Sequence, residues 1–470
     1  MNSKFDLHMH STASDGSDTI PILWEKLKNS RIRVFSLTDH DTISGTLEME
    51  KLVSDDVFFL RGVELSCVSP AGKCHILGYH FDPNDPLLRR VLNEKSPEVP
   101  WHMDLRIFIT LLLVDIGMIA LVFMIRKARG VSETFLESLE FWKCLDSASY
   151  LDIARGWYPS SGEQVVQLVF FPGYPLAIQL MNTLVGDLLL SGMIVSALSF
   201  AGTGCVLYRL VRLDGDHADG IRALKYLCIL PGVFFYAAPM TESLFILLCA
   251  SCIYCARTGK WTLGCLLGGL AAFTRSVGII LIAPLAMELI RAMRKGRRQS
   301  RLFWAGKWAA LLLVAAGLGA YLYINYSVSG DPFKFREYQS SHWGQRLGYF
   351  FHTAAYQLEN AITSYTEKPY NFMGLWLPNL IATFGSLIVM TFAAKKLRPS
   401  YMAWFIAYFA FAIGATWLLS APRYLMAAVP VPLAFATLAK NQDVDTLLTP
   451  CLVGMSLLYT YAFVARWQVW

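Results

Sequence analysis

The strongest constraint on the fold of this chain is a succession of apolar segments that fills residues 101–470. A segment of about 20 mostly apolar residues is long enough to cross the hydrocarbon core of a bilayer as an α-helix. Only 16% of the residues are charged and the mean hydropathy is +0.42, whereas soluble domains carry about 25% charged residues. The sequence therefore predicts a multi-pass α-helical membrane protein.

The apolar runs and their breaks predict about eleven transmembrane helices. They are expected near 105–125, 187–208, 223–239, 241–256, 261–274, 276–291, 303–326, 373–394, 401–420, 424–439 and 447–465. Residues before this region have an ordinary soluble composition and contain no long apolar run, so we expect no signal peptide. Composition and the prolines of the connecting segment predict a small α/β domain at 1–97, a linker at 98–104 and a membrane domain at 105–470.

Lys and Arg are concentrated in the short loops 209–225, 257–260, 291–301 and 395–398. Because cytoplasmic loops are rich in these residues, we expect these four loops and the N-terminal domain to be cytoplasmic, in a plasma-membrane protein. The loops expected outside are 126–186, 239–243, 274–276, 327–372 and 421–424. The basic run 126–129 disagrees with this orientation. The net charge of +6 arises mostly from the inner loops, so we expect no nucleic-acid partner.

Histidine and acidic residues recur through the N-terminal domain beside short apolar runs. They occur in DLHMHSTASDG (6–16), SLTDHDT (36–42), GVELS (62–66) and HILGY (75–79). Each group is expected just after a strand, with helices near 20–30 and 44–53 between the strands, as in βαβ units. Side chains at such strand ends converge on one face, where imidazoles and carboxylates can hold Zn, Mn or Fe.

This motif set resembles the PHP family of metal-dependent phosphoesterases. The resemblance implies metal ligands at His8, His10, Asp15, His40, Glu64 and His75. A PHP barrel has about seven βα units, whereas this domain stops near Pro97 after roughly three, before the family's later ligands. We therefore expect a partial barrel with an incomplete ligand set, which serves as a regulatory or vestigial domain rather than a fully active phosphoesterase.

The outer loop 126–186 contains the segment 141–175, in which Asp146, Asp152 and Glu163 lie among aromatic residues and prolines. A carboxylate-bearing loop at the edge of a membrane domain is either a site of chemistry or an interfacial anchor. The same alternatives apply to Glu242, Arg275 and Arg423, which lie at the ends of predicted spans.

The segments LDSASYLDIARGWY, FFPGYP, PGVFFYAAPMTESLF, GLAAFTRSVGI, GDPFKFREYQSSHWGQR and APRYLMAAVP together resemble the PIG-V-type mannosyltransferases of the GT-C superfamily. The resemblance covers most of 105–440 in the expected order. It implies transfer of a sugar, mannose, from a polyprenyl-phosphate carrier to the hydroxyl of a lipid, glycan or protein acceptor. Transfer would occur at the extracytoplasmic face with inversion. The lipid-linked sugar is the donor, no cofactor is certain for this step, and the sequence leaves its dependence on a metal open.

The same resemblance assigns roles within the outer loops. Asp146 would be the general base, and Arg275 and Arg423 would bind the departing phosphate. Residues that would shape the sugar and acceptor pocket are Tyr150, Asp152, Tyr174, Glu242 and Gln339. The chain departs from the family pattern at Leu145, where relatives have an aromatic residue, and at Gly173, where they often have Leu.

Two other functions remain open from the sequence. One is a membrane-tethered PHP-type phosphoesterase completed by a partner. The other is a transporter or flippase for lipid-linked sugars, which would favour internal repeats and charges at mid-membrane depth. Asp115 is the acidic residue at such a depth, and no clear repeat is present.

Overall fold

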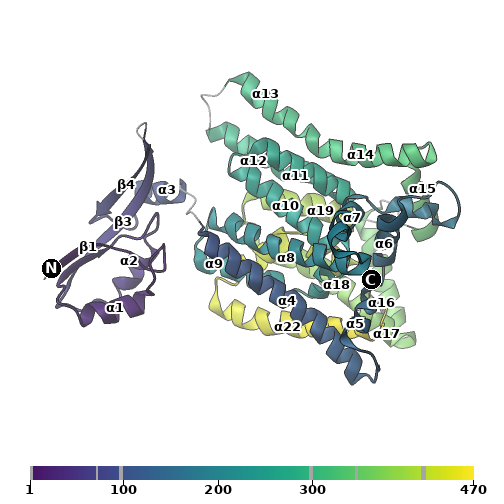
Figure 1. Cartoon of the computed structure of the whole chain (residues 1–470), viewed down its shortest axis with the longest axis horizontal. Helices are drawn as coiled ribbons and strands as arrows, with labels where there is room; N and C mark the ends of the chain where they lie inside the picture. The colour runs from purple at the N-terminus through teal and green to yellow at the C-terminus, as the bar shows by residue number, and fades with distance from the viewer. Residues whose placement is uncertain are drawn as a thin grey trace. The chain divides into compact units, whose positions relative to one another are not determined.

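The computed structural model describes residues 4–69, 72–94, 99–295, 300–344, 348–413 and 420–469. The chain forms two compact units (Figure 1). The first contains residues 1–104 with 212–215, and the second contains 105–211 and 216–470. The predicted linker 98–104 overlaps the start of α4 (Trp101–Ala128), and residue 98 lies outside the described residues.

The first unit is built on one four-stranded sheet with the order β1-β2-β3-β4. The strands are β1 (Phe5–Met9), β2 (Val34–Leu37), β3 (Phe58–Ser69) and β4 (Gly72–Tyr79). Strands β1, β2 and β3 are parallel, whereas β4 is antiparallel to β3 and forms a hairpin with it. The helices are α1 (Ile20–Lys28), α2 (Ser44–Met49) and α3 (Pro86–Glu94). The predicted βαβ arrangement is confirmed for the parallel part of the sheet.

The core of this unit forms where α1 covers β2. Ile20, Trp24 and Leu27 are buried, and their spacing places them on one face of the helix. They pack with Phe35 and Leu37 of β2. The exposed face of the helix carries Glu25, Lys26 and Lys28 together with Ile22, which is 49% exposed, so α1 is fixed on the sheet by its buried apolar stripe.

The second unit is helical, and in the described residues six helices are long and apolar enough to cross a membrane. They are Trp101–Ala128 (α4), Leu188–Arg212 (α8), Ser276–Arg294 (η4 and α12), Arg301–Ser329 (α13 and α14), Pro369–Ala393 (α17, η5 and α18) and Gln442–Val464 (α22). A seventh is present if η2 (Glu163–Val169) and α7 (Gly173–Val185), which meet at 103°, are one broken span. The multi-pass helical fold is therefore confirmed.

The predicted number of about eleven spans exceeds the six or seven found among the residues that the structure describes, because several apolar segments form short helices. The helices in question are α9 (His217–Ile229), α10 (Thr241–Arg257), α11 (Trp261–Thr274), α19 (Pro399–Tyr408) and α21 (Pro430–Leu438). Even α10, with 17 residues, is only about 26 Å long at 1.5 Å per residue. Residues 414–419 of the predicted span 401–420 lie outside the described residues.

The predicted outer loop 126–186 is folded into short helices rather than extended chain. It contains α5 (Phe135–Ser138), η1 (Leu139–Trp142), α6 (Ser147–Gly156), η2 and α7. The ring of Trp142 lies 5.9 Å from that of Phe463 on α22, and Phe463 also stacks on Phe234 at 4.4 Å. This aromatic contact fixes η1, and hence the start of α6, against the helical bundle.

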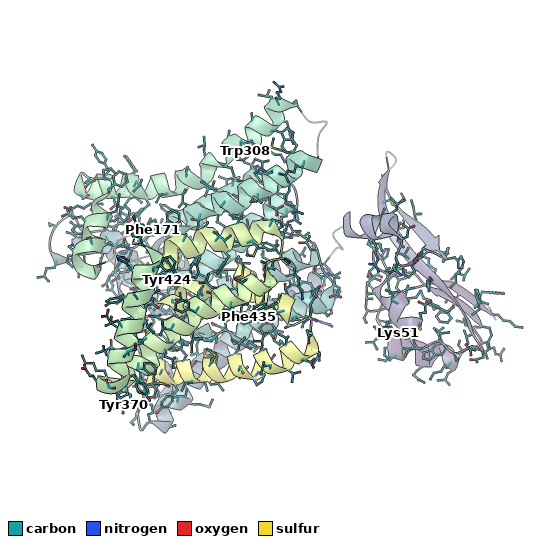
Figure 2. All side chains as sticks on the ribbon, turned by 180° about the vertical axis from the view of Figure 1, so that it is seen from behind. Lys51, Phe171, Trp308, Tyr370, Tyr424 and Phe435 are labelled. Carbon is teal, nitrogen blue, oxygen red and sulfur yellow. The ribbon has the colours of Figure 1, made fainter. Side chains whose placement is uncertain are left out.

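The bend between η2 and α7 is held by a second aromatic contact. Phe171 (Figure 2) stacks on Tyr321 of α14 with ring centroids 3.7 Å apart. The Tyr321 hydroxyl donates a hydrogen bond to the Leu168 carbonyl oxygen at 2.5 Å. The remaining elements are η3 (Val233–Tyr236), α15 (Lys334–Trp343), α16 (Phe350–Glu367), η6 (Phe409–Ile413) and α20 (Ala421–Met426).

Helices α11 and α14 approach each other closely at a pair of glycines. A Cβ atom added to Gly317 would lie 1.8 Å from the carbonyl oxygen of Gly269. Small residues permit such backbone contact between membrane helices, where van der Waals packing drives association. A residue larger than glycine at position 317 would therefore force the two helices apart.

We expect Gly317→Ala to destabilise the protein by about 1–3 kcal/mol, because the added methyl group forces the two helices apart. The measurement is the midpoint of thermal unfolding in detergent. Gly319→Ala is the matched control, since a Cβ at Gly319 on the same helix meets nothing within 4 Å. Equal midpoints for the two variants would contradict this account of the crossing.

Candidate active site and candidate metal centre

Asp146 begins α6 in an unusual way. Leu145 before it has a φ of 53°, in the left-handed region that non-glycine residues rarely adopt. An Asp at a helix N-cap usually accepts a hydrogen bond from an amide of its own first turn. Here the Asp146 side chain makes no such bond. Its Oδ2 atom instead accepts a hydrogen bond from Arg423 Nη1 at 2.6 Å, so the carboxylate is directed away from α6 and towards α20.

Glu242, in the first turn of α10, connects Arg423 to a second arginine. Its Oε1 atom accepts a hydrogen bond from Arg423 Nε at 2.6 Å and another from Arg275 Nη1. Arg275, directly after α11, also donates to the Thr241 hydroxyl at 3.1 Å. We call Asp146, Glu242, Arg275 and Arg423 the ion-pair cluster. It joins four segments that lie far apart in the sequence.

Burial within the ion-pair cluster is uneven. The exposed fraction of the side chain is 0% for Glu242, 8% for Arg423 and 12% for Arg275, but 34% for Asp146. The two carboxylates balance the two guanidinium groups, as buried charges require. The Arg275 guanidinium also lies 5.3 Å from the centre of the Tyr424 ring, where the π-electrons attract a cation. Asp146 is therefore the accessible member of an otherwise buried, electrically neutral group.

Two of the predicted pocket residues, Tyr150 and Tyr174, pack against each other between α6 and α7. Tyr150 of α6 is buried and meets Tyr174 of α7 edge to face, with ring centroids 5.7 Å apart. The Tyr174 hydroxyl is hydrogen-bonded to the Gly192 carbonyl oxygen at 2.8 Å and to the Ser196 hydroxyl at 2.7 Å. Tyr174 thus fastens α7 to α8, and Tyr150 packs against it.

The structure places Asp152 and Gln339 elsewhere. Asp152 is on the solvent-exposed face of α6, with 43% of its side chain exposed, and its carboxylate pairs with Arg155 at 3.1 Å. Gln339 is on α15, which packs against η2. Thr241 and Tyr424, which support Arg275, were not singled out from the sequence. The sequence signal that could have identified them is their position, because each directly adjoins a predicted site residue, Glu242 or Arg423.

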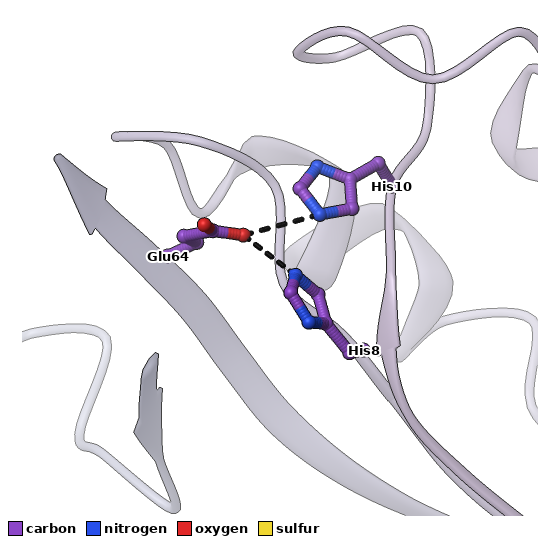
Figure 3. A group of neighbouring side chains, drawn as sticks. All are labelled: His8, His10 and Glu64. Atoms are coloured by element: carbon purple, nitrogen blue, oxygen red, sulfur yellow. Dashed lines mark hydrogen bonds and ion pairs between the residues drawn. The ribbon is translucent and has the colours of Figure 1, made fainter. Parts of the chain in front are cut away.

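In the first unit, Glu64 lies at the centre of a group of histidines. Its Oε2 atom is 2.7 Å from His8 Nε2 and 3.1 Å from His10 Nε2 (Figure 3). Its Oε1 atom faces His75 Nδ1, and His40 Nδ1 lies 3.8 Å away. Burial raises the pKa of the Glu64 carboxyl, but hydrogen bonds from His8 and His75 outweigh it and leave the pKa below its ordinary value.

Asp15 connects the remaining histidines. Its carboxylate lies 2.8 Å from His10 Nδ1 and 3.6 Å from His40 Nε2. Three overlapping groups have donor atoms within 4.8 Å of one another, as a metal ion requires. They are His8, His10 and Glu64; His10, Asp15 and His40; and His40, Glu64 and His75. The structure thus brings all six predicted ligands together, and their imidazole and carboxylate donors suit Zn, Mn or Fe.

The expected position of these residues just after strands is wrong for three of them. His8 lies within β1, Glu64 within β3 and His75 within β4. The reason is that β3 continues past Glu64 and pairs with β4 in a hairpin, where Glu64 lies opposite Leu77. The antiparallel β4 therefore delivers His75 from the middle of a strand.

The loop between β1 and α1 is fixed by Asp39, which was not among the predicted site residues. Asp39 is fully buried, and its carboxylate accepts hydrogen bonds from the Ser11 amide at 2.7 Å and from the Ser11 and Ser14 hydroxyls at 2.8 Å. A Cβ at Gly45 would lie 2.2 Å from Asp39 Oδ2. Asp39 thereby positions the loop that carries His10 and Asp15.

Comparison with known proteins gives relatives for the first unit. No protein-family model matches the chain. The 5'-3' exoribonuclease of Haemophilus influenzae is 35% identical over 97 residues, which cover 20% of this chain and 35% of that protein. The 3',5'-nucleoside bisphosphate phosphatase of Chromobacterium violaceum is 33% identical over 87 residues, covering 18% and 30%. The chain spans about a third of the length of these relatives. The predicted resemblance of the first unit to phosphoesterases is confirmed.

Two solved structures show weaker similarity. An amidohydrolase from Chromobacterium violaceum matches at 23% identity and a TM-score of 0.19, covering 40% of this chain and 52% of that chain. ArnT from Cupriavidus metallidurans, bound to undecaprenyl phosphate, matches at 14% identity and a TM-score of 0.42, covering 69% and 72%. Similarity at this level is too slight to assign a substrate.

Proposed function

We propose that the helical unit is a GT-C-type membrane glycosyltransferase with the ion-pair cluster as its active site. The observation that carries the proposal is the contact between Asp146 and Arg423. Sequence resemblance gives these residues the roles of base and phosphate ligand, and their side chains meet at 2.6 Å although 277 positions separate them. The proposed donor is a polyprenyl-phosphate sugar, mannose by resemblance, used at the extracytoplasmic face of the plasma membrane.

In the proposed reaction, the acceptor hydroxyl attacks the anomeric carbon of the sugar and gives its proton to the Asp146 carboxylate. The bond between the anomeric carbon and the phosphate oxygen breaks, and polyprenyl phosphate leaves. Arg275 and Arg423 stabilise the negative charge that grows on the phosphate. A single displacement of this kind inverts the anomeric configuration. Tyr150 and Tyr174 form the packed wall beside Asp146, while Asp152 and Gln339 would contact acceptor groups further out.

The experiment is transfer of radiolabelled mannose by the purified protein in lipid nanodiscs, with total membrane lipid as the acceptor source. We expect label to be transferred from polyprenyl-phosphate mannose but not from a nucleotide-linked mannose. Transfer from the nucleotide donor alone would contradict the proposal. Other carrier-linked sugars, supplied in parallel, identify the sugar.

We also propose that the first unit binds a Zn, Mn or Fe ion through His8, His10, Asp15, His40, Glu64 and His75. The observation in favour is the convergence of their donor atoms around Glu64. Such an ion would supply Lewis-acid chemistry for phosphoester hydrolysis. The chain spans only about a third of its relatives, so we expect any hydrolysis by the full-length protein to be much slower than that of a complete phosphoesterase.

Replacing Glu64 by Gln should remove most of the bound metal, because Glu64 offers an oxygen to two of the three ligand groups. The measurement is metal content per protein by mass spectrometry after dialysis against Mn²⁺ or Zn²⁺. Glu50→Gln is the control, since Glu50 pairs with Arg61 outside the cluster. Equal metal content in the two variants would contradict the proposed centre.

A further inference from the structure

Arg423 is shared between two carboxylates that differ in how firmly they are held. Its Nε atom donates to Glu242 and its Nη1 atom to Asp146, both at 2.6 Å. Glu242 is fully buried and also bonded to Arg275. Asp146 is 34% exposed, and within the described residues Arg423 is its charged hydrogen-bond partner. Of the two carboxylates, Asp146 is the one already in contact with solvent, so it can move away from Arg423 when another anion takes its place there.

The contact has a consequence for the proposed chemistry. Asp146 Oδ2 accepts the hydrogen bond from Arg423 Nη1, so the carboxylate faces Arg423 and not an acceptor hydroxyl. It also fills part of the guanidinium edge that a phosphate would bind bidentately. In the structure, the base and the phosphate ligand therefore block each other.

A bound donor would add a negative charge to a cluster whose charges already balance. That charge can be accommodated if Asp146 moves off Arg423 towards its exposed side. The amides of the first turn of α6 receive no side-chain cap in the structure, and the N-terminal end of a helix favours a nearby carboxylate. Asp146 thus has an alternative position beside its own helix, within the same loop.

We propose that the phosphate of the lipid-linked donor displaces Asp146 from Arg423, so that the base is released only when the donor is bound. This inference rests on the proposed function. It makes binding ordered, with the donor before the acceptor, because an acceptor that arrives first meets a carboxylate engaged by Arg423. It also limits proton abstraction to the complex in which the sugar is present.

The first test measures binding of polyprenyl phosphate, without a sugar, to the full-length protein in nanodiscs. We expect Asp146→Ala and Asp146→Asn to bind it about two- to tenfold more tightly than wild type, because the competing ion pair is lost. Glu163→Gln, which removes an exposed acid at the start of η2, should leave binding unchanged. Unchanged or weaker binding by both Asp146 variants would overturn the inference.

The second test separates displacement from a simple loss of negative charge. Carboxyl groups of the wild-type protein are labelled with a carbodiimide and an amine, and the labelled peptides are quantified by mass spectrometry. Polyprenyl phosphate should increase the labelling of Asp146 severalfold and leave that of the exposed Glu163 unchanged. Constant or reduced labelling of Asp146 would overturn the inference. If wild type does not bind polyprenyl phosphate at all, the proposed function itself fails, which is a distinguishable outcome.

Discussion

Asp146→Asn is expected to lower the rate of sugar transfer by about 10²–10⁴-fold, the usual contribution of a general base. Asn is close to Asp in size, and its carbonyl oxygen can still accept the hydrogen bond from Arg423. The change therefore removes the proton acceptor while the cluster keeps its shape. The measurement is the turnover of polyprenyl-phosphate mannose at saturating donor.

The control for this prediction is Glu163→Gln, which removes a carboxylate from the same segment 141–175. Glu163 is exposed at the start of η2, so we expect its loss to change the rate far less. The elution profile and unfolding midpoint of both variants should match those of wild type. Transfer by Asp146→Asn at the wild-type rate would exclude Asp146 as the base.

The sequence predicted the members of the ion-pair cluster but not its connections. Loop charges placed Asp146, Glu242, Arg275 and Arg423 on one side of the membrane, and motif resemblance gave each a role. That Glu242 joins the two arginines depends on the depth of the first turn of α10, where its exposure is 0%. Depth is a result of tertiary packing, and residue order alone does not contain it.

The left-handed backbone conformation of Leu145 could not be predicted from the sequence either. The sequence marked this position only as a departure from the family pattern, whereas its φ of 53° turns the chain into α6. Leu145 packs against the core that contains Trp142 and Phe463. Packing of a leucine can offset the strain of a left-handed backbone, and no local residue preference signals this in advance.

In the first unit, the ligand set was more predictable than the strands that carry it. The resemblance of four motifs to a family of metal-dependent phosphoesterases marked His8, His10, Asp15, His40, Glu64 and His75 as one ligand set. The β3–β4 hairpin was not predicted, because a strand that continues past a polar residue resembles one that ends there. The identity of the ligand residues could therefore be predicted from the sequence, whereas the pairing of β3 with β4 could not.

The largest effect on stability is expected for Glu242→Gln, at about 3–5 kcal/mol, the usual result of breaking a buried ion pair from one side. The Glu242 side chain has no exposed surface, and both Arg275 and Arg423 bond to its Oε1 atom. A neutral amide would leave two buried guanidinium groups with Asp146 as the remaining carboxylate of the cluster. We expect a lower unfolding midpoint in detergent and loss of transfer.

The double variant Glu242→Gln with Arg275→Gln tests the charge explanation directly. It restores a neutral pair of Asp146 and Arg423, so we expect it to be less destabilised than the sum of the two single variants. Glu163→Gln, an exposed acid at the start of η2, is the control and should leave the midpoint unchanged. Additive effects in the double variant would show that Glu242 stabilises the site by packing rather than by balancing the arginines. In that case the cluster would no longer explain why two arginines are buried beside the proposed base.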